Sequence, residues 1–223
     1  WCKRPGTIGA TMNALVGCKK VSQGCTHCYA IEVSHIRAGN LLPVMQDKFA
    51  GTTRVEGGKR VWTGKVTMTE KALLDPLRRK KPRTYFVNAL SVLFYEEVPE
   101  DWVDRHLAVF ALSPQHNFII LTKRPDRMRE YFRRDPEKRR RRVLDIAMQM
   151  QETIPAAMRP PFVGVMEVLP NVWLGTSVEN QATADERIPI LLQTPAAIRF
   201  VSYEPALGPV DFTRLAQPSG DVI

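Results

Sequence analysis

Thr84-Tyr85-Phe86-Val87-Asn88 begins the stretch that decides the fold class, and Asn117-Phe118-Ile119-Ile120-Leu121-Thr122 ends it. Both segments are short, apolar and rich in β-branched or aromatic side chains, which predicts buried strands. Between them, apolar side chains recur at helical spacing over residues 101–112. A strand, a helix and a second strand in this order predict two parallel strands joined by a right-handed crossover.

The same alternation extends in both directions along the chain. We expect a strand at 65–69 and a helix at 70–80 before this stretch, then a strand at 172–178, a helix at 182–192 and a strand at 198–203 after it. Such units predict an α/β fold of the (β/α) TIM-barrel-like kind, a partial barrel of about six parallel strands. A doubly wound sheet is the alternative.

The other segments have weaker patterns. Residues 29–38 have helical spacing, whereas 41–64 lack a regular period and are predicted to be loop. Basic helix follows residue 122, with a second helix over 137–151. We interpret 135–170 as an inserted basic helix and a Pro-rich linker.

The whole chain, residues 1–223, is expected to form a single domain, because its length is that of one large domain. The chain begins at Trp1, and Asp221-Val222-Ile223 has the apolar character of a strand that is just beginning. We therefore expect the domain to be truncated at its C-terminus. The sequence has no run of 18 apolar residues and no secretion signal, so we expect no membrane contact and a cytoplasmic location.

The segment from Gly17 to Ala30 contains three of the four cysteines, at the spacing C-x6-C-x2-C. Thiols this close together are typical of ligands and not of a disulfide framework. Three are one too few for a closed tetrahedral zinc site, and one too few for an iron–sulfur cluster held wholly by protein thiolates.

A 4Fe-4S cluster on Cys18, Cys25 and Cys28 would leave one iron without a protein ligand. S-adenosylmethionine (SAM) can bind such an iron through its amino and carboxylate groups. The reduced cluster would then cleave the sulfonium to methionine and a 5'-deoxyadenosyl radical.

Zinc is the competing interpretation of the same segment. His27, His35 or Cys2 would then supply the fourth ligand of the site. Three buried free cysteines without a metal are a further alternative.

Polar side chains follow several of the predicted strands, at the edge where ligands bind in such folds. Ser177-Val178-Glu179 and Ser202-Tyr203-Glu204 are near copies of each other at two strand ends. Either they line one pocket, or they only end strands and cap the next helices. The predicted cofactor-binding residues are Asn88, Ser91, Lys123, Ser177, Glu179, Ser202 and Glu204.

The net charge of +9 is concentrated locally. Residues 123–142 contain eleven Lys or Arg against four Asp or Glu. A local basic excess predicts a phosphate-rich partner, and a solvated basic insertion is the alternative. The predicted nucleic-acid contacts are Arg78, Arg79, Lys80, Lys81, Lys123, Arg124, Arg139, Arg140, Arg141 and Arg142.

Five motifs together resemble a family of uncharacterised, phage-associated proteins that is grouped with the radical SAM enzymes. They are Gly17-Cys18 through Cys28-Tyr29-Ala30, Phe86-Val87-Asn88-Ala89-Leu90-Ser91, Leu121-Thr122-Lys123-Arg124-Pro125, Asn171-Val172-Trp173-Leu174-Gly175 and Ser202-Tyr203-Glu204-Pro205. The resemblance covers Trp1 to Ile223. It implies a TIM-barrel-like radical SAM domain with the cluster on Cys18, Cys25 and Cys28, and it implies no particular substrate.

Two features depart from the expected patterns. Most radical SAM enzymes have C-x3-C-x2-C, whereas this chain and the family it resembles have C-x6-C-x2-C. Val92 and Tyr95 occupy positions where the family pattern has Asp and His, so substrate or activity could differ.

We therefore expect a radical SAM enzyme that acts on a nucleic acid or a nucleotide-like molecule and needs an electron donor for its cluster. The alternative is a non-enzymatic zinc or iron–sulfur module that binds nucleic acid. A barrel that keeps the cluster only as structure is a third possibility.

Overall fold

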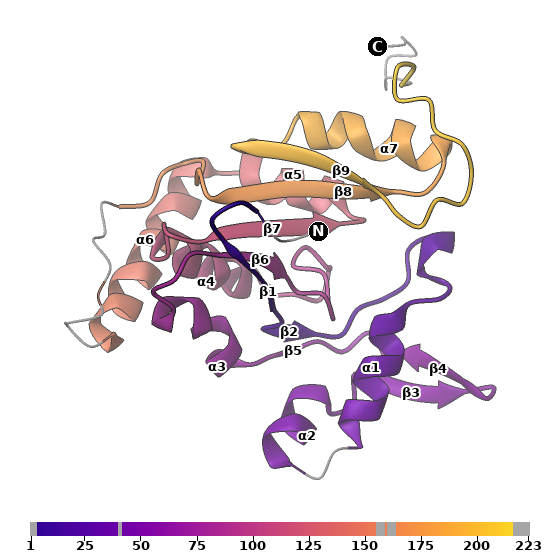
Figure 1. Ribbon diagram of the computed structural model, residues 1–223, viewed down its shortest axis with the longest axis horizontal. Helices are drawn as coiled ribbons and strands as arrows, with labels where there is room; N and C mark the ends of the chain where they lie inside the picture. Colours follow the sequence, from indigo (N-terminus) through magenta and orange to yellow (C-terminus); the bar gives the residue numbers. More distant parts are fainter. Residues whose placement is uncertain (1–3, 40–41, 155–158, 160–163, 216–223) are drawn as a thin grey trace.

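The computed structural model describes residues 4–39, 42–154, 159 and 164–215. Within these residues, five parallel strands form the main sheet, in the order β1 (Ile8–Met12), β6 (Arg83–Val87), β7 (Asn117–Thr122), β8 (Val172–Val178) and β9 (Ile198–Tyr203) (Figure 1). The strands follow one another across the sheet in chain order, without reversal. This is the order of a barrel wall, whereas a doubly wound sheet reverses its direction. The predicted α/β class with parallel strands is confirmed.

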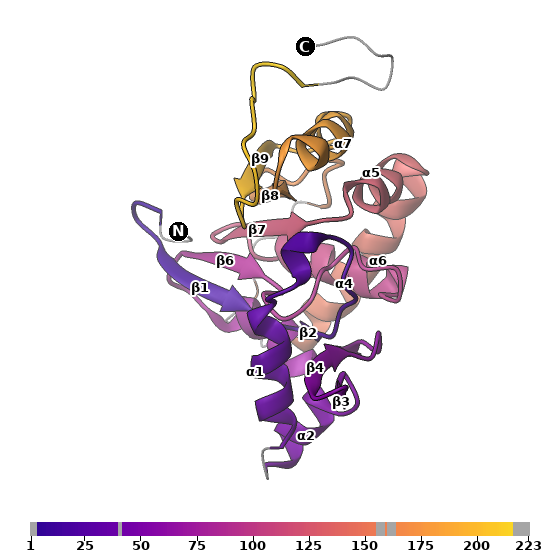
Figure 2. The ribbon, with the colours of Figure 1, turned by 90° about the vertical axis from the view of Figure 1, so that its right-hand side faces the viewer.

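Four helices cover one face of this sheet (Figure 2). They are α4 (Glu100–Ala111), α5 (Pro125–Arg133), α6 (Pro136–Thr153) and α7 (Gln181–Leu192). The predicted helices at 101–112, 137–151 and 182–192 are therefore confirmed with small changes of boundary. Their apolar stripes face the sheet because each crossover must bury its hydrophobic side.

The main core lies between the sheet and these helices. Phe118 of β7 is fully buried, with the Phe110 ring of α4 stacked 4.1 Å from it and the Tyr85 ring of β6 at 5.5 Å. Burying side chains of this size contributes about 1.5–3 kcal/mol each. The core therefore holds the strand ends at fixed positions.

The opposite face of the sheet carries the alternate side chains, because successive residues of a strand point to opposite faces. On this face the Phe200 ring of β9 lies over Gly175 of β8, so closely that a Cβ at position 175 would be 2.3 Å from it. Trp173 packs against Arg4, whose guanidinium lies 4.2 Å from the ring centre.

One predicted strand lies outside the main sheet, and one strand of the main sheet was not predicted. The strand expected at 65–69 is only β5 (Thr67–Met68), which pairs antiparallel with β2 (Leu15–Val16) outside the main sheet. The edge strand beside β6 is instead β1, which we did not predict. Its residues, Ile8-Gly9-Ala10-Thr11-Met12, lack the apolar run of the other strands because most of them remain exposed at the edge.

The helix expected at 70–80 is divided. It consists of α3 (Glu70–Leu73) and a 3-10 helix, η2 (Asp75–Arg78). Pro76 lies at the start of η2, where its missing N–H removes no helical hydrogen bond but prevents α3 from continuing.

The loop predicted at 41–64 was also wrong. This part forms helix α2 (Pro43–Phe49) and a hairpin of β3 (Thr53–Glu56) and β4 (Lys59–Trp62). Gly57 and Gly58 both have positive φ, 55° and 74°, which suits a tight two-residue hairpin turn. With α1 (Tyr29–Ala38), confirmed as predicted, these elements form a small lobe beside the sheet (Figure 1).

Some predicted features lie outside the described residues. They are Pro155, Pro160 and Pro161 of the linker and the strand expected at 221–223. In the described part of the chain, none of the helices combines the length and apolar character needed to cross a membrane.

Candidate functional site

The cysteine segment lies at the carboxyl edge of the main sheet. It leaves β2, passes through a short 3-10 helix, η1 (Gln23–Cys25), and enters α1 (Figure 1). Cys18, Cys25 and Cys28 are all half-buried, and all three line one pocket of about 440 Å³. The three thiols therefore line a cavity outside the main core, while Ala30 at the end of the segment packs in a small apolar cluster with Val16 and Phe49.

The floor of this pocket is the sheet face opposite the helices. Phe86 of β6, Leu121 of β7 and Ser177 of β8 line it. Phe86 and Leu121 each alternate with a neighbour that packs in the main core, and Val178, which follows Ser177, packs in a smaller cluster under α7. Its outer wall is apolar and open, because Val21, Tyr29 and Leu207 line it and are between 45% and 61% exposed. Carboxyl ends of parallel strands are the usual place for ligands in such folds.

Backbone contacts hold the start of the cysteine segment. Gly17 has φ +107°, and a Cβ there would lie 2.0 Å from the carbonyl oxygen of Lys65, so only glycine fits. The Gly17 N–H donates to the Leu90 carbonyl at 3.1 Å, and its own carbonyl accepts from Ser91 Oγ at 2.6 Å. Ser91 lines the pocket, but its hydroxyl is used to hold the residue before Cys18.

Asn88 has a similar structural task. It is buried, with φ +62°, and its Oδ1 accepts a hydrogen bond from the Leu15 N–H at 3.0 Å. Its amide nitrogen lies 3.4 Å from Nε2 of the buried His106. Asn88 therefore joins the end of β6 to β2 while it also lines the pocket.

Arg124 holds the Cys18 side of the segment. Its buried guanidinium lies 4.8 Å from the Tyr95 ring centre and pairs with Glu96 at 2.7 Å. It also donates to the Lys19 carbonyl at 2.8 Å and approaches Cys18 Sγ at 4.0 Å. Burial raises the pKa of the Cys18 thiol, and the Arg124 charge opposes this.

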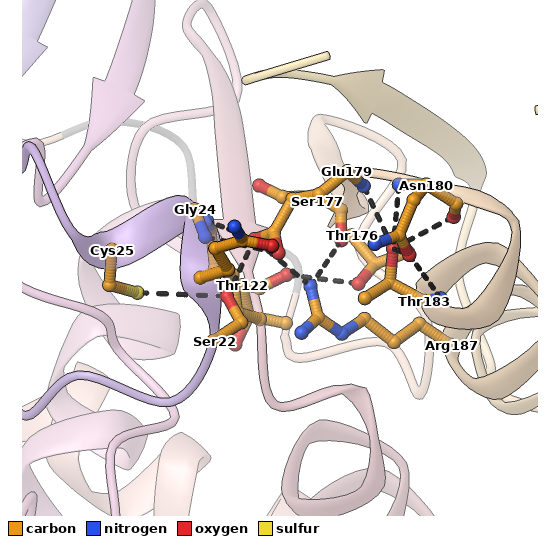
Figure 3. Close-up of polar contacts among 12 residues, drawn as sticks. Ser22, Gly24, Cys25, Thr122, Thr176, Ser177, Glu179, Asn180, Thr183 and Arg187 are labelled. Atoms are coloured by element: carbon orange, nitrogen blue, oxygen red, sulfur yellow. Dashed lines mark hydrogen bonds and ion pairs between the residues drawn. The ribbon is translucent and has the colours of Figure 1, made fainter. Parts of the chain in front are cut away.

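Glu179 holds the Cys25 side (Figure 3). Its side chain is 1% exposed, Oε1 accepts from Ser22 Oγ at 2.7 Å, and Oε2 accepts from the Gly24 N–H at 3.3 Å. Lys123 forms a direct ion pair with it, and Arg187 lies 3.6 Å away. Burial disfavours ionisation of Glu179, but the hydrogen bonds from Lys123 and Ser22 outweigh it and hold the carboxyl pKa below its usual value.

Cys25 shares this polar surrounding. Its sulfur lies 3.9 Å from Ser22 Oγ. Burial raises the pKa of the thiol, but backbone hydrogen bonds from Val21 and Ser22, together with the Lys123 charge, outweigh burial and lower it. Lys123 and Arg124 are thus consecutive basic residues that lie next to different cysteines.

The two Ser-x-Glu motifs lie side by side, because Ser177 pairs with Ser202 in the β8–β9 register. Ser177 and Glu204 line the pocket, whereas Ser202 and Glu179 are absent from its wall. Within the described residues, we find no hydrogen bond or ion pair to the exposed Glu204 carboxylate. The cap of α7 is Asn180, whose side chain accepts from the Thr183 N–H at 3.0 Å.

Among the described residues, no group of three His, Cys, Asp or Glu side chains is arranged to hold a single metal ion. His35, a candidate zinc ligand, lies 3.1 Å from Thr53 Oγ1 of the hairpin. His27 lines the pocket with the thiols, and Cys2 lies outside the described residues. The three thiols thus share one cavity but do not converge on one point.

The predicted basic surface divides into buried and exposed residues. Arg139 is 4% exposed and donates to the carbonyls of Tyr131, Phe132 and Glu167, so its guanidinium is internal, like that of Arg124. Arg79, Arg140 and Arg142 have acidic partners, namely Asp75, Glu137 and Asp104. Arg78, Lys80, Lys81 and Arg141 are exposed and form no ion pair within the described part of the chain.

Three structural roles were not predicted. Ser22 and Arg187 both interact with Glu179, and Gly24 lies against its carboxylate. Nothing in the spacing of the sequence joins residues 22–24 to Glu179, because the contact forms only when the segment folds over the end of β8. The only hint was the glycine that precedes Cys25.

Comparison with known proteins gives one family and no named relative. Neither the curated proteins nor the solved structures include a match to this chain. A family model described as "Protein of unknown function (DUF5131)" matches residues 6–219. Since these residues are almost the whole chain, it belongs to this family of proteins of unknown function.

Proposed function

We propose that this chain holds a 4Fe-4S cluster on Cys18, Cys25 and Cys28 and is a radical SAM enzyme. The observation that carries the proposal is that all three thiols line one pocket at the carboxyl edge of a parallel sheet. When bound, such a cluster supplies one electron to the SAM sulfonium and an iron with an open ligand position. Phage association and the kinship with radical SAM enzymes are part of the same proposal.

The arrangement of the thiols favours a cluster over a single zinc ion. A zinc site needs four ligands within about 2.0–2.3 Å of one point, and no such group is formed by the described residues. A four-iron cluster is wider than one ion and binds each thiolate at a separate iron. Thiols around a shared cavity therefore fit the cluster better.

The residues beside the thiols suit thiolate ligands. Lys123 lies near Cys25, and Arg124 lies near Cys18. A positive charge near a thiol favours its deprotonated form, which is the form that binds metal. Both cations are themselves fixed, by Glu179 and Glu96 respectively, so the charge is held in place.

The pocket also has room for more than the cluster ligands. Its volume of about 440 Å³ falls in the range of small-molecule sites. The exposed Tyr29 ring offers a stacking face for a base, and Val21 and Leu207 add apolar surface in the same pocket. Lys19 lines the same pocket and is exposed. These features support a nucleotide-like or nucleic-acid substrate.

The larger basic segments lie elsewhere. Residues 78–81 come directly before β6, so they lie at the amino end of the sheet, opposite the cysteine segment. Figure 1 places α6, which contains Arg139 to Arg142, away from η1. A nucleic acid that contacts both regions must therefore extend across the molecule.

Anaerobic reconstitution with iron and sulfide tests the cluster. We expect about four irons and four sulfides per chain, loss of most of this iron in Cys18→Ala, Cys25→Ala and Cys28→Ala, and little loss in Cys2→Ala. A change of the cluster spectrum on adding SAM, and 5'-deoxyadenosine after adding dithionite as electron donor, would support the enzyme. One zinc and no cluster would favour the non-enzymatic zinc module. A cluster whose spectrum does not change with SAM, and which forms no 5'-deoxyadenosine, would have only a structural role.

Binding to single-stranded DNA and RNA over a salt series tests the substrate class. We expect affinity to fall steeply with salt, and the slope to decrease by about 0.7 for each phosphate that a variant no longer neutralises. Lys80→Ala with Lys81→Ala should reduce the slope, and Arg139→Met should not, because Arg139 is internal. Negligible binding at low salt would exclude nucleic acid as the substrate and leave a small nucleotide-like molecule as the candidate.

A further inference from the structure

We infer that Glu179 is a positioning residue, which fixes the Cys25 half of the cysteine segment against the end of β8, while Arg124 fixes the Cys18 half. The inference deepens the proposed function and rests on it, because Cys25 and Cys18 are two of the proposed cluster ligands. It states which residues hold these two cysteines in position. The anchoring itself is a property of the protein without any cluster.

Two hydrogen bonds join the Glu179 carboxylate to the cysteine segment, and Lys123 and Arg187 compensate its charge. One oxygen accepts from Ser22 Oγ and from Lys123, and the other accepts from the Gly24 N–H. Ser22 is the residue before η1, and Gly24 lies inside η1 directly before Cys25. With a side chain 1% exposed and absent from the pocket wall, Glu179 is poorly placed to touch a ligand.

The closeness of the contact is evident at Gly24. A Cβ at this position would lie 2.4 Å from Glu179 Oε1 and 2.7 Å from Lys123 Nζ. The segment can approach the carboxylate this closely only because residue 24 has no side chain. A buried carboxylate that loses such donors becomes costly, so segment and anchor stabilise each other.

The second Ser-x-Glu motif provides a matched comparison. Glu204 follows the neighbouring strand, and Tyr203 pairs with Val178, so the two glutamates leave adjacent strands at the same level. Glu204 is exposed and lines the pocket, and Glu179 is buried and holds the segment. The two copies of one motif therefore have different tasks.

Hydrogen–deuterium exchange of the metal-free, reduced protein tests the inference. In Glu179→Ala we expect backbone exchange within residues 20–28 to rise about tenfold, since a hydrogen bond to a charged group contributes roughly that factor. Glu179→Gln keeps one acceptor oxygen and should recover part of the protection. Ser22→Ala removes a single donor and should give a smaller increase while leaving Glu179 buried. Glu204→Ala is the control and should leave exchange unchanged.

Peptides from β7 and α4 report whether each variant is folded. Unchanged exchange within residues 20–28 in folded Ser22→Ala and Glu179→Gln would overturn the inference, as would an equal increase in Glu204→Ala. Iron loading of the same variants is measured separately. Increased exchange in a protein that never binds a cluster would refute the proposed function alone, and a loaded cluster with unchanged exchange would refute the inference alone.

Discussion

Gly24 and Glu179 are 155 residues apart in the chain, yet the carboxylate of one accepts the backbone N–H of the other at 3.3 Å. This contact places the cysteine segment over the end of β8. The carboxylate has little room to withdraw, because Ser22, Lys123 and Arg187 surround it. The position of Cys25 therefore depends on the absence of one methyl group.

Gly24→Ala should displace the cysteine segment. The added Cβ meets a buried carboxylate, so we expect a loss of about 1–3 kcal/mol in stability, the usual cost of overpacking. Urea unfolding measures the loss, and iron content after reconstitution measures the effect on the proposed site. Gly39→Ala is the control, because the nearest atom to its new Cβ is an ordinary 3.6 Å away. Equal behaviour of both variants would contradict the prediction.

Gly175→Ala tests the packing on the sheet face opposite the helices. Its Cβ would lie 2.3 Å from the Phe200 ring, and we expect a loss of about 1–3 kcal/mol. In a Phe200→Ala background the same change should cost less than about 0.5 kcal/mol, because the obstructing ring is gone. A double-mutant cycle by urea unfolding gives the coupling. Additive effects would mean that the two residues do not meet.

Buried His106 should make stability depend on pH. Burial lowers its pKa from 6.5 to about 4 in the folded chain. The unfolded chain therefore binds more protons between these values, and the stability that neutral His106 retains at pH 7 is lost as pH falls from 6.5 towards 4. At pH 5 the free energy of unfolding is therefore about 2 kcal/mol lower than at pH 7 on account of His106.

Urea unfolding at pH 7.5 and 5.0 measures this effect. His106→Gln should reduce the loss between the two pH values, and part of the loss should remain because burial also lowers the pKa of His116. The exposed His27→Gln is the control and should behave like the parent protein. The assignment fails if His106→Gln retains the full loss.

Arg139 and Arg141 should differ sharply although they are two residues apart. Arg139→Met leaves three backbone carbonyls without their donor, and we expect it to cost about 1–3 kcal/mol. Arg141→Met changes an exposed side chain and should stay within about 0.5 kcal/mol. Thermal or urea unfolding of both variants measures the difference, and two equal losses would place Arg139 at the surface.

Much of the fold could be predicted from local pattern. The apolar runs of β6, β7, β8 and β9 and the helical spacing of α4 and α7 are visible in the sequence, because buried strands and amphipathic helices impose their own periods. The strand β1 was missed for the same reason, since an exposed edge strand imposes no such pattern. The β3–β4 hairpin depended on one glycine pair that we interpreted as loop.

The candidate site divides in the same way. The three cysteines and the polar residues at the strand ends follow from the sequence, because thiol spacing and strand ends are local properties. Which of these residues face the pocket depends on contacts between distant parts of the chain, so the local sequence does not decide it. Glu179 and Glu204 both end a Ser-x-Glu motif. Only the fold of the cysteine segment over β8 buries the first and leaves the second in the pocket wall.

The basic residues illustrate the physical reason. Charge can be counted in a sequence, but whether a guanidinium meets solvent or a carbonyl depends on which surfaces pack together. Arg124 and Arg139 are internal because the ends of β7 and α6 fold against other parts of the chain. The sequence by itself determined the thiols and the elements with a strong apolar period, because those periods are local. Tertiary packing decided the remaining elements, which side chains hold the site and which remain free to bind.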